Sequence, residues 1–194
     1  MGLLLGILKP LQMVNDVVLR LGRGIGIVAI ALMVICILLQ VVMRYVFNNA
    51  LPWPEEAARF LMLWMTGLMA PSAYRRGGFV AIEMLEPLLP PRVGAALALV
   101  LLVLSGLVLW MGLQLGLKHV NSGWLFASSS LYVPMEVIGQ KGFKLKLAWM
   151  YLSLYVGLIL LLVVNVELIL RALVRMLGGE ERLRPQIHAE LTAE

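Results

Sequence analysis

The chain has 194 residues, of which 61% are hydrophobic and 14% charged, with a mean hydropathy of +0.93 and a formal net charge of +5. Soluble domains average about 45–50% apolar and about 25% charged residues, so this composition indicates a small helical membrane protein. One cysteine, Cys36, and two histidines outside the apolar runs, His119 and His188, argue against an intrachain disulfide, a catalytic or metal site, and a bound haem. The positive charge does not indicate a nucleic-acid partner, because Lys and Arg gather at the ends of apolar segments, where they orient helices in a bilayer.

The first 23 residues predict an amphipathic helix that lies on the membrane surface. One face carries apolar residues at helical spacing, namely Leu11, Val14, Val18 and Leu21. Another face carries the charged residues Lys9, Asp16, Arg20 and Arg23. Such a helix directs its basic side chains toward anionic headgroups. The apolar start precedes its first charge and has no clear small-residue cleavage pattern, so we expect no signal peptide.

Four apolar segments follow, and each can cross a bilayer, which takes about 20 helical residues. They predict spans over about 24–43, 57–74, 93–117 and 147–170, within a transmembrane domain of residues 24–171. The second segment reaches spanning length only if Arg59 extends its side chain to the surface. Between the second and third spans, residues 80–89 predict a second, shorter interfacial helix. Residues 172–194 form a polar tail. The expected fold class is therefore an all-α membrane protein with four transmembrane helices and two interfacial ones.

The distribution of Lys and Arg predicts the orientation of these helices. Ten lie on the side of the two termini and the second connection, and six lie on the side of the first and third connections. Because the cytoplasmic side carries the excess, we expect a multi-pass protein with both termini in the cytoplasm.

The centres of the predicted spans carry no ionisable residue, although such groups usually mark ion or proton pathways. Glu167 lies near the cytoplasmic end of the fourth span, four residues before Arg171, and predicts an ion pair there. Gln114 is the amide deepest in a span, and we expect it to hydrogen-bond between helices. Gly112 and Gly116 form a GxxxG pattern, which fits either a close helix contact or chance in an apolar sequence. Alone, this chain is not expected to move an ion or a polar solute.

The most distinctive segment is 44–59, a polar and aromatic stretch between the first two apolar runs. Its asparagines favour a turn, and its two prolines hold Trp53 in an extended elbow. Glu55 and Glu56 open the second helix at the positive end of its dipole, and Arg59 follows at a spacing that allows an ion pair. A well-capped loop with aromatic anchors accounts for each of these residues singly.

As a combination, they resemble the signature of the DctQ-type small membrane subunit of tripartite ATP-independent periplasmic (TRAP) transporters. The matching residues are Arg44, Tyr45, Leu51, Trp53, Glu55, Glu56, Arg59, Phe60, Leu61 and Trp64, continued by Gly67, Ala73, Arg75, Arg76 and Gly78. The sequence departs from the family pattern at Phe79, where a histidine is frequent, and at Tyr155, where a proline is common.

The resemblance implies a non-catalytic small subunit of a sodium-coupled carboxylate importer in the bacterial inner membrane. Its implied partners are a large membrane subunit that holds the sodium and substrate sites, a periplasmic substrate-binding protein, and membrane lipids. We expect no cofactor in this chain. The residues expected to contact a partner or lipid are Arg44, Tyr45, Trp53, Glu55, Glu56, Arg59, Trp64, Arg75 and Arg76. The four charged residues of segment 44–59 are expected to form one periplasmic cluster, the two tryptophans to anchor or pack, and Arg75 and Arg76 to hold the cytoplasmic boundary.

Three other classes of protein compete with this interpretation. A generic membrane anchor of another complex fits the composition, and only segment 44–59 argues against it. A four-span homodimeric exporter needs a membrane-embedded carboxylate, and the first span has none. A membrane redox enzyme would have almost no chemistry available with one cysteine and two peripheral histidines, so we expect no enzyme.

Overall fold

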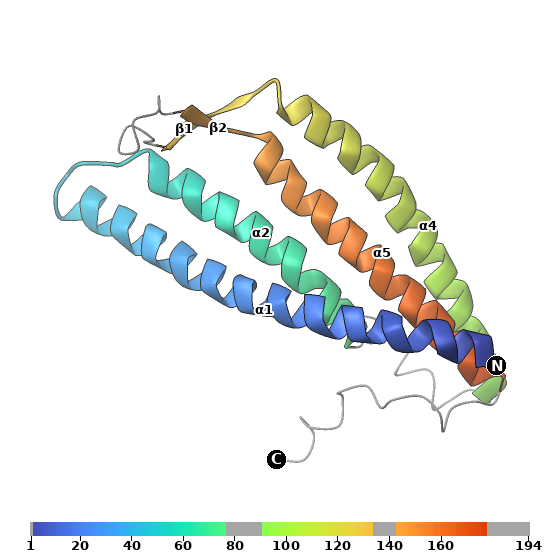
Figure 1. Ribbon diagram of the computed structural model, residues 1–194. Helices are drawn as coiled ribbons and strands as arrows, with labels where there is room; N and C mark the ends of the chain where they lie inside the picture. The colour runs from blue at the N-terminus through green and yellow to red at the C-terminus, as the bar shows by residue number, and fades with distance from the viewer. Residues whose placement is uncertain (1, 77–90, 134–142, 178–194) are drawn as a thin grey trace, which may run out of the picture.

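The computed structural model describes residues 2–76, 91–133 and 143–177, which form four long helices and one β-hairpin (Figure 1). The elements are α1 (Gly2–Tyr45), α2 (Trp53–Arg75), α4 (Pro91–Gly123), β1 (Ala127–Val133), β2 (Phe143–Lys146) and α5 (Ala148–Met176). The predicted helical architecture is confirmed. The predicted interfacial helix over 80–89 and most of the polar tail lie outside the described residues.

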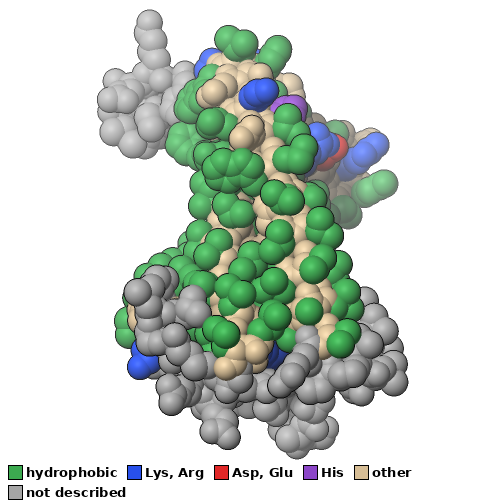
Figure 2. Space-filling model, turned by 90° about the vertical axis from the view of Figure 1, so that its right-hand side faces the viewer, with side chains coloured by type: hydrophobic (Ala, Val, Ile, Leu, Met, Phe, Trp, Pro, Cys, Tyr) green, Lys and Arg blue, Asp and Glu red, His purple; other side chains and the backbone are tan. Residues whose placement is uncertain are grey.

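The helices form an open row and do not close into a bundle around one core. In Figure 1, α2 lies between α1 and α5, and α4 packs on the other side of α5. The α1–α2 loop and the hairpin meet at one end of the row, called here the hairpin end. Toward the opposite end, called here the Glu167 end, the last turn of α2 meets α5 near Glu167. Hydrophobic side chains cover the visible face between the two ends, with Lys and Arg near the ends (Figure 2). A row of this kind leaves broad apolar faces for lipid or for another protein.

Helix α1 runs without interruption through the boundary that the sequence analysis placed at residue 23. Its buried residues repeat at helical spacing, as Leu8, Gln12, Asn15, Leu19, Gly22, Gly26 and Ala29. The glycines within this set meet α2: a Cβ on Gly26 would lie 2.7 Å from Cγ of Met69. The expected apolar face is not the packed one, because the side chains of Val14 and Leu21 are 56% and 62% exposed. Gly22 and Gly26 are therefore contact points between two helices.

Three of the described helices are long and apolar enough to cross a membrane, over Leu8–Tyr45, Val93–Gly123 and Ala148–Met176. The predicted segment 57–74 is helical, as part of α2, but it does not reach the apolarity of the other three. Charged residues in its first turns and a proline and serine near its end lower its mean hydropathy. Three of the four predicted transmembrane helices are therefore supported by length and apolarity, and the one over 57–74 is not confirmed.

The closest approach in the row is a glycine crossing between α2 and α5. A Cβ on Gly157 would lie 2.9 Å from Cα of Gly67, and one on Gly67 would overlap the carbonyl oxygen of Ser153. The predicted GxxxG pair of α4 also faces α5, but a Cβ on Gly112 or Gly116 would meet side chains of α5 at an ordinary 3.5 Å. Gly112 and Gly116 therefore lie at a contact between α4 and α5, but the two backbones do not approach closely there.

Asn165, and not Gln114 as predicted, is the amide that hydrogen-bonds between α4 and α5. Asn165 is fully buried in α5, and its Nδ2 donates a hydrogen bond of 3.1 Å to the carbonyl oxygen of Leu102 in α4. Gln114 is exposed on α4. Its position well inside the predicted third span made Gln114 a candidate, but it lies on the face of α4 that points away from α5.

The hairpin was missed by the sequence analysis. β1 and β2 pair antiparallel, with Ala127 opposite Lys146 and Val133 opposite Phe143. The alternation of Phe143, Lys144, Leu145 and Lys146 is a strand signal, but it is only four residues long. The hairpin joins α4 to α5 and lies over the beginning of α2 (Figure 1).

Candidate functional site

A buried carboxylate in α5 bonds to residues of α1 and α2 at the Glu167 end. The Glu167 side chain is 0% exposed. Its Oε1 accepts from Nη2 of Arg75 at 2.9 Å and from Nε of Arg171 at 3.1 Å, and its Oε2 accepts from Nδ2 of Asn15 at 2.6 Å. Arg75 also donates through Nη1 to Asp16. We call these five residues the Glu167 clasp; they join α1, α2 and α5.

The Glu167 clasp is charge-balanced, with two carboxylates facing two guanidinium groups. The Arg75 and Arg171 side chains are mostly buried, at 16% and 11% exposed. Leaving either charge buried without a partner is costly, so the clasp stabilises the row only as a complete set. The predicted pair of Glu167 and Arg171 is confirmed. No local pattern indicates Arg75 and Asn15 as partners, because they lie 92 and 152 positions from Glu167. The structure places Arg75 inside the clasp and leaves Arg76 exposed beside it.

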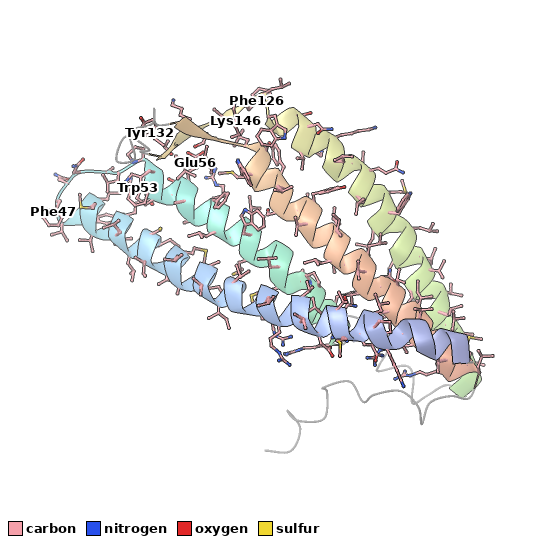
Figure 3. All side chains as sticks on the ribbon, in the orientation of Figure 1. Phe47, Trp53, Glu56, Phe126, Tyr132 and Lys146 are labelled. Atoms are coloured by element: carbon pink, nitrogen blue, oxygen red, sulfur yellow. The ribbon has the colours of Figure 1, made fainter. Side chains whose placement is uncertain are left out.

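A second carboxylate, Glu56, holds the hairpin against α2. It accepts hydrogen bonds from the backbone N–H of Ser130 at 2.9 Å, from Oγ of Ser129 at 3.4 Å, and from Oγ of Ser130. Ser128 Oγ in turn accepts from the N–H of Leu131 at 2.8 Å. Figure 3 shows Glu56 at the start of α2, below β1 and Tyr132. We call Glu56 and the three serines the Glu56 clasp.

The hydrogen bonds of the Glu56 clasp favour the ionised carboxylate. Burial by itself raises the pKa of Glu56, but the bonds donated by Ser130, Ser128 and Ser129 outweigh it and lower the pKa from 4.5 to about 2. Glu56 is therefore an anion at neutral pH. Its partners are three consecutive serines more than 70 positions away, a pairing that helical spacing could not reveal.

The other charged residues of segment 44–59 do not join Glu56 in one cluster. Glu55 pairs with Arg59 at 3.3 Å in the predicted i,i+4 arrangement, with 68% and 60% of the side chains exposed. Arg44 lies over its neighbour Tyr45, 6.0 Å from the ring centroid. The loop turns at Asn48, whose φ is 54°, as its asparagines predicted. The single predicted cluster is therefore three separate interactions.

Aromatic side chains surround the hairpin end. Those exposed there are Tyr45, Phe47, Trp53, Trp124, Phe126 and Tyr132, four of which are labelled in Figure 3. Trp124 packs edge-on against Trp149 at 6.2 Å between ring centroids. Trp64 instead lies deeper in α2, next to Phe60 at 6.4 Å. Exposed aromatics at one level of a membrane protein are typical of the lipid–water interface.

Within the described ranges, no group of three or more His, Cys, Asp or Glu side chains is placed to hold a metal ion. Two carboxylates fix helices and a hairpin relative to one another at opposite ends of an apolar row.

Comparison with known proteins assigns this arrangement to a family. The TRAP transporter small permease protein of Haemophilus influenzae is 33% identical to this chain over 97 residues, which cover 46% of the chain and 60% of that protein. The family model for the DctQ component of tripartite ATP-independent periplasmic transporters matches residues 33–175, which include segment 44–59, the hairpin, Glu56 and Glu167. The chain therefore belongs to the DctQ component family of tripartite ATP-independent periplasmic transporters.

Proposed function

We propose that this chain is the non-catalytic small subunit of a sodium-coupled TRAP importer of carboxylates, and that it acts as a scaffold for the large transport subunit. The observation that carries this proposal is the use of its buried carboxylate. Both oxygens of Glu167 accept hydrogen bonds, Oε1 from Arg75 and Arg171 and Oε2 from Asn15, and the side chain is 0% exposed, so neither oxygen is open to a sodium ion or a substrate cation. Sodium and substrate would bind in the partner.

We further propose that α2 crosses the membrane beside the three more apolar helices. Its 23 residues rise about 34 Å, which exceeds the roughly 30 Å of a hydrocarbon core. It is flanked on both sides by candidate spans, α1 and α5, and its charged residues lie at its ends. Thr66, in the middle of the helix, donates its hydroxyl to the carbonyl oxygen of Met62 in the same helix. Four crossings place both ends of the chain on one side, and the excess of Lys and Arg makes that side cytoplasmic in the bacterial inner membrane.

On this orientation the hairpin end faces the periplasm. The Glu56 clasp would then fix the hairpin as part of the surface on which a periplasmic substrate-binding protein docks. The exposed aromatic residues around it would sit at headgroup level. The large subunit would cover one apolar face of the open row.

The proposal is tested by purifying the tagged chain from its native membrane in a mild detergent and identifying what accompanies it by mass spectrometry. A large multi-span permease in near-stoichiometric amount is expected. If the chain is recovered alone as a stable homo-oligomer, the scaffold function is wrong and a self-sufficient exporter must be considered. A stable partner of another class would instead support a membrane anchor.

A charge reversal tests the role of the hairpin end within that complex. Glu56→Arg should lower solute uptake by the reconstituted transporter, because it removes the anion that the serines bind. Glu55→Arg is the matched control, since Glu55 is adjacent, carries the same charge and pairs only with exposed Arg59. Equal uptake by both variants and the wild type would remove Glu56 from the function.

A further inference from the structure

Three of the arginines at the Glu167 end lie close to one another outside the Glu167 clasp. Arg20 and Arg23 lie on α1, and Arg76 follows the last residue of α2. Among the residues that the structure describes, no ion pair joins any of the three to a carboxylate; Asp16 is close enough to attract Arg23, but its ion pair is with Arg75. We call Arg20, Arg23 and Arg76 the arginine triad.

The arginine triad is held together by the fold. Arg23 donates from Nη1 to Oγ of Ser72 at 2.8 Å, and Ser72 itself is buried in α2, so the guanidinium group is fixed beside the end of that helix. Arg20 and Arg76 are close enough for their charges to repel that of Arg23. Both are exposed. Three like charges gathered in this way are unfavourable until an anion joins them.

The surface next to the triad is apolar. Ile27, Val34 and Leu38 continue the face of α1 that bears Arg20 and Arg23, and all three are exposed. A soluble anion could use only the guanidinium groups. A phospholipid could use both features, with its phosphate on the arginines and its acyl chains along this face.

We propose that the arginine triad binds the phosphate group of an anionic phospholipid. A guanidinium group pairs with phosphate through two parallel hydrogen bonds, and Arg23 is already oriented for such a pair by Ser72. The position suits a headgroup, because Arg23 is the last charged residue of α1 before the uncharged run from Gly24 to Met43. This binding needs only a membrane location and is independent of the transporter role proposed above.

The test is native mass spectrometry of the full chain in a mild detergent, titrated with phosphatidylglycerol or with zwitterionic phosphatidylcholine. The wild type should retain phosphatidylglycerol preferentially. Each arginine replaced by glutamine should weaken that binding about fivefold, so the triple variant Arg20→Gln/Arg23→Gln/Arg76→Gln should lose on the order of 100-fold. The matched control, Lys118→Gln/Lys144→Gln/Lys146→Gln, removes the same charge from the hairpin end and should bind as the wild type does.

Three results would overturn the proposal. The triple variant could bind phosphatidylglycerol as well as the wild type, or both triple variants could lose it equally, which would indicate a general charge effect. Inorganic phosphate could displace the lipid and form its own adduct with the same arginine dependence, which would make this a soluble-anion site. Circular dichroism checks folding; should the triple variant fail to fold, exposed Arg76→Gln alone must still weaken binding about fivefold.

Discussion

Replacing Glu167 by glutamine tests whether the Glu167 clasp holds the row together. Glu167→Gln keeps the shape of the side chain but removes the negative charge that faces Arg75 and Arg171. Both guanidinium groups are mostly buried, and only one carboxylate, Asp16, would remain for them. Breaking a buried pair by removing one partner costs about 3–5 kcal/mol, because the other charge is left uncompensated. For a chain of this length that corresponds to a fall in Tm of about 6–20 °C.

The assay is thermal unfolding of the purified chain in one fixed detergent, followed by circular dichroism. Glu55→Gln is the control, because it removes the same charge from an exposed pair that contributes about 0–1 kcal/mol. The double variant Glu167→Gln/Arg75→Gln should recover part of the loss, since it also removes a stranded cation. A Glu167→Gln variant that melts with the wild type, or a control that falls as far, would refute the reasoning.

The remaining predictions concern the glycine crossing, the Glu56 clasp and the interhelical amide. Gly157→Ala should destabilise the row by about 1–3 kcal/mol, because its new Cβ meets backbone that must shift. Gly112→Ala should be neutral or stabilising by up to about 1 kcal/mol, because its Cβ has room and alanine favours a helix. The melting temperature of the first variant should therefore lie below that of the second. The pKa of the Glu56 carboxyl is lowered to about 2 from 4.5, so its stabilisation of the hairpin is present above pH 4.5 and is lost as the pH falls toward 2. The hydrogen-exchange protection factor of the Ser130 amide should fall over the same pH range. Glu56→Gln should abolish this pH dependence. Asn165→Ala should cost about 1 kcal/mol by removing the hydrogen bond to α4, and a melting temperature equal to that of the wild type would show that the bond is energetically neutral.

Hydropathy located most of the fold, because spanning a bilayer imposes one strong and local requirement on sequence. The predicted span over 93–117 lies within α4, the span over 147–170 coincides with α5 except for Leu147, and the first span lies within α1. The continuity of α1 could not be predicted in the same way. Glycine is usually unfavourable in the middle of a helix, so Gly22 and Gly26 do not predict a continuous one. Only the position of α2 shows that these two residues allow close contact between α1 and α2.

The candidate site was predictable where its contacts are local. The pairs Glu167–Arg171 and Glu55–Arg59 follow from i,i+4 spacing, and both are present. Neither the addition of Arg75 to the first pair nor the capture of Glu56 by the hairpin could be foreseen. Those contacts depend on which helices become neighbours, and in a chain this apolar nearly every face can pack against another.

The specific contacts of the row explain how it keeps an open shape. Lipid tails are as apolar as leucine, so helices in a membrane gain little from burying apolar surface against each other and need close packing or hydrogen bonds instead. Each neighbouring pair here has such a contact: Arg23 with Ser72 between α1 and α2, Gly67 with Gly157 between α2 and α5, and Asn165 with α4. The two clasps then fix the ends. A row held by contacts between neighbours leaves its apolar faces open, which is the property that a scaffold for a larger membrane subunit requires.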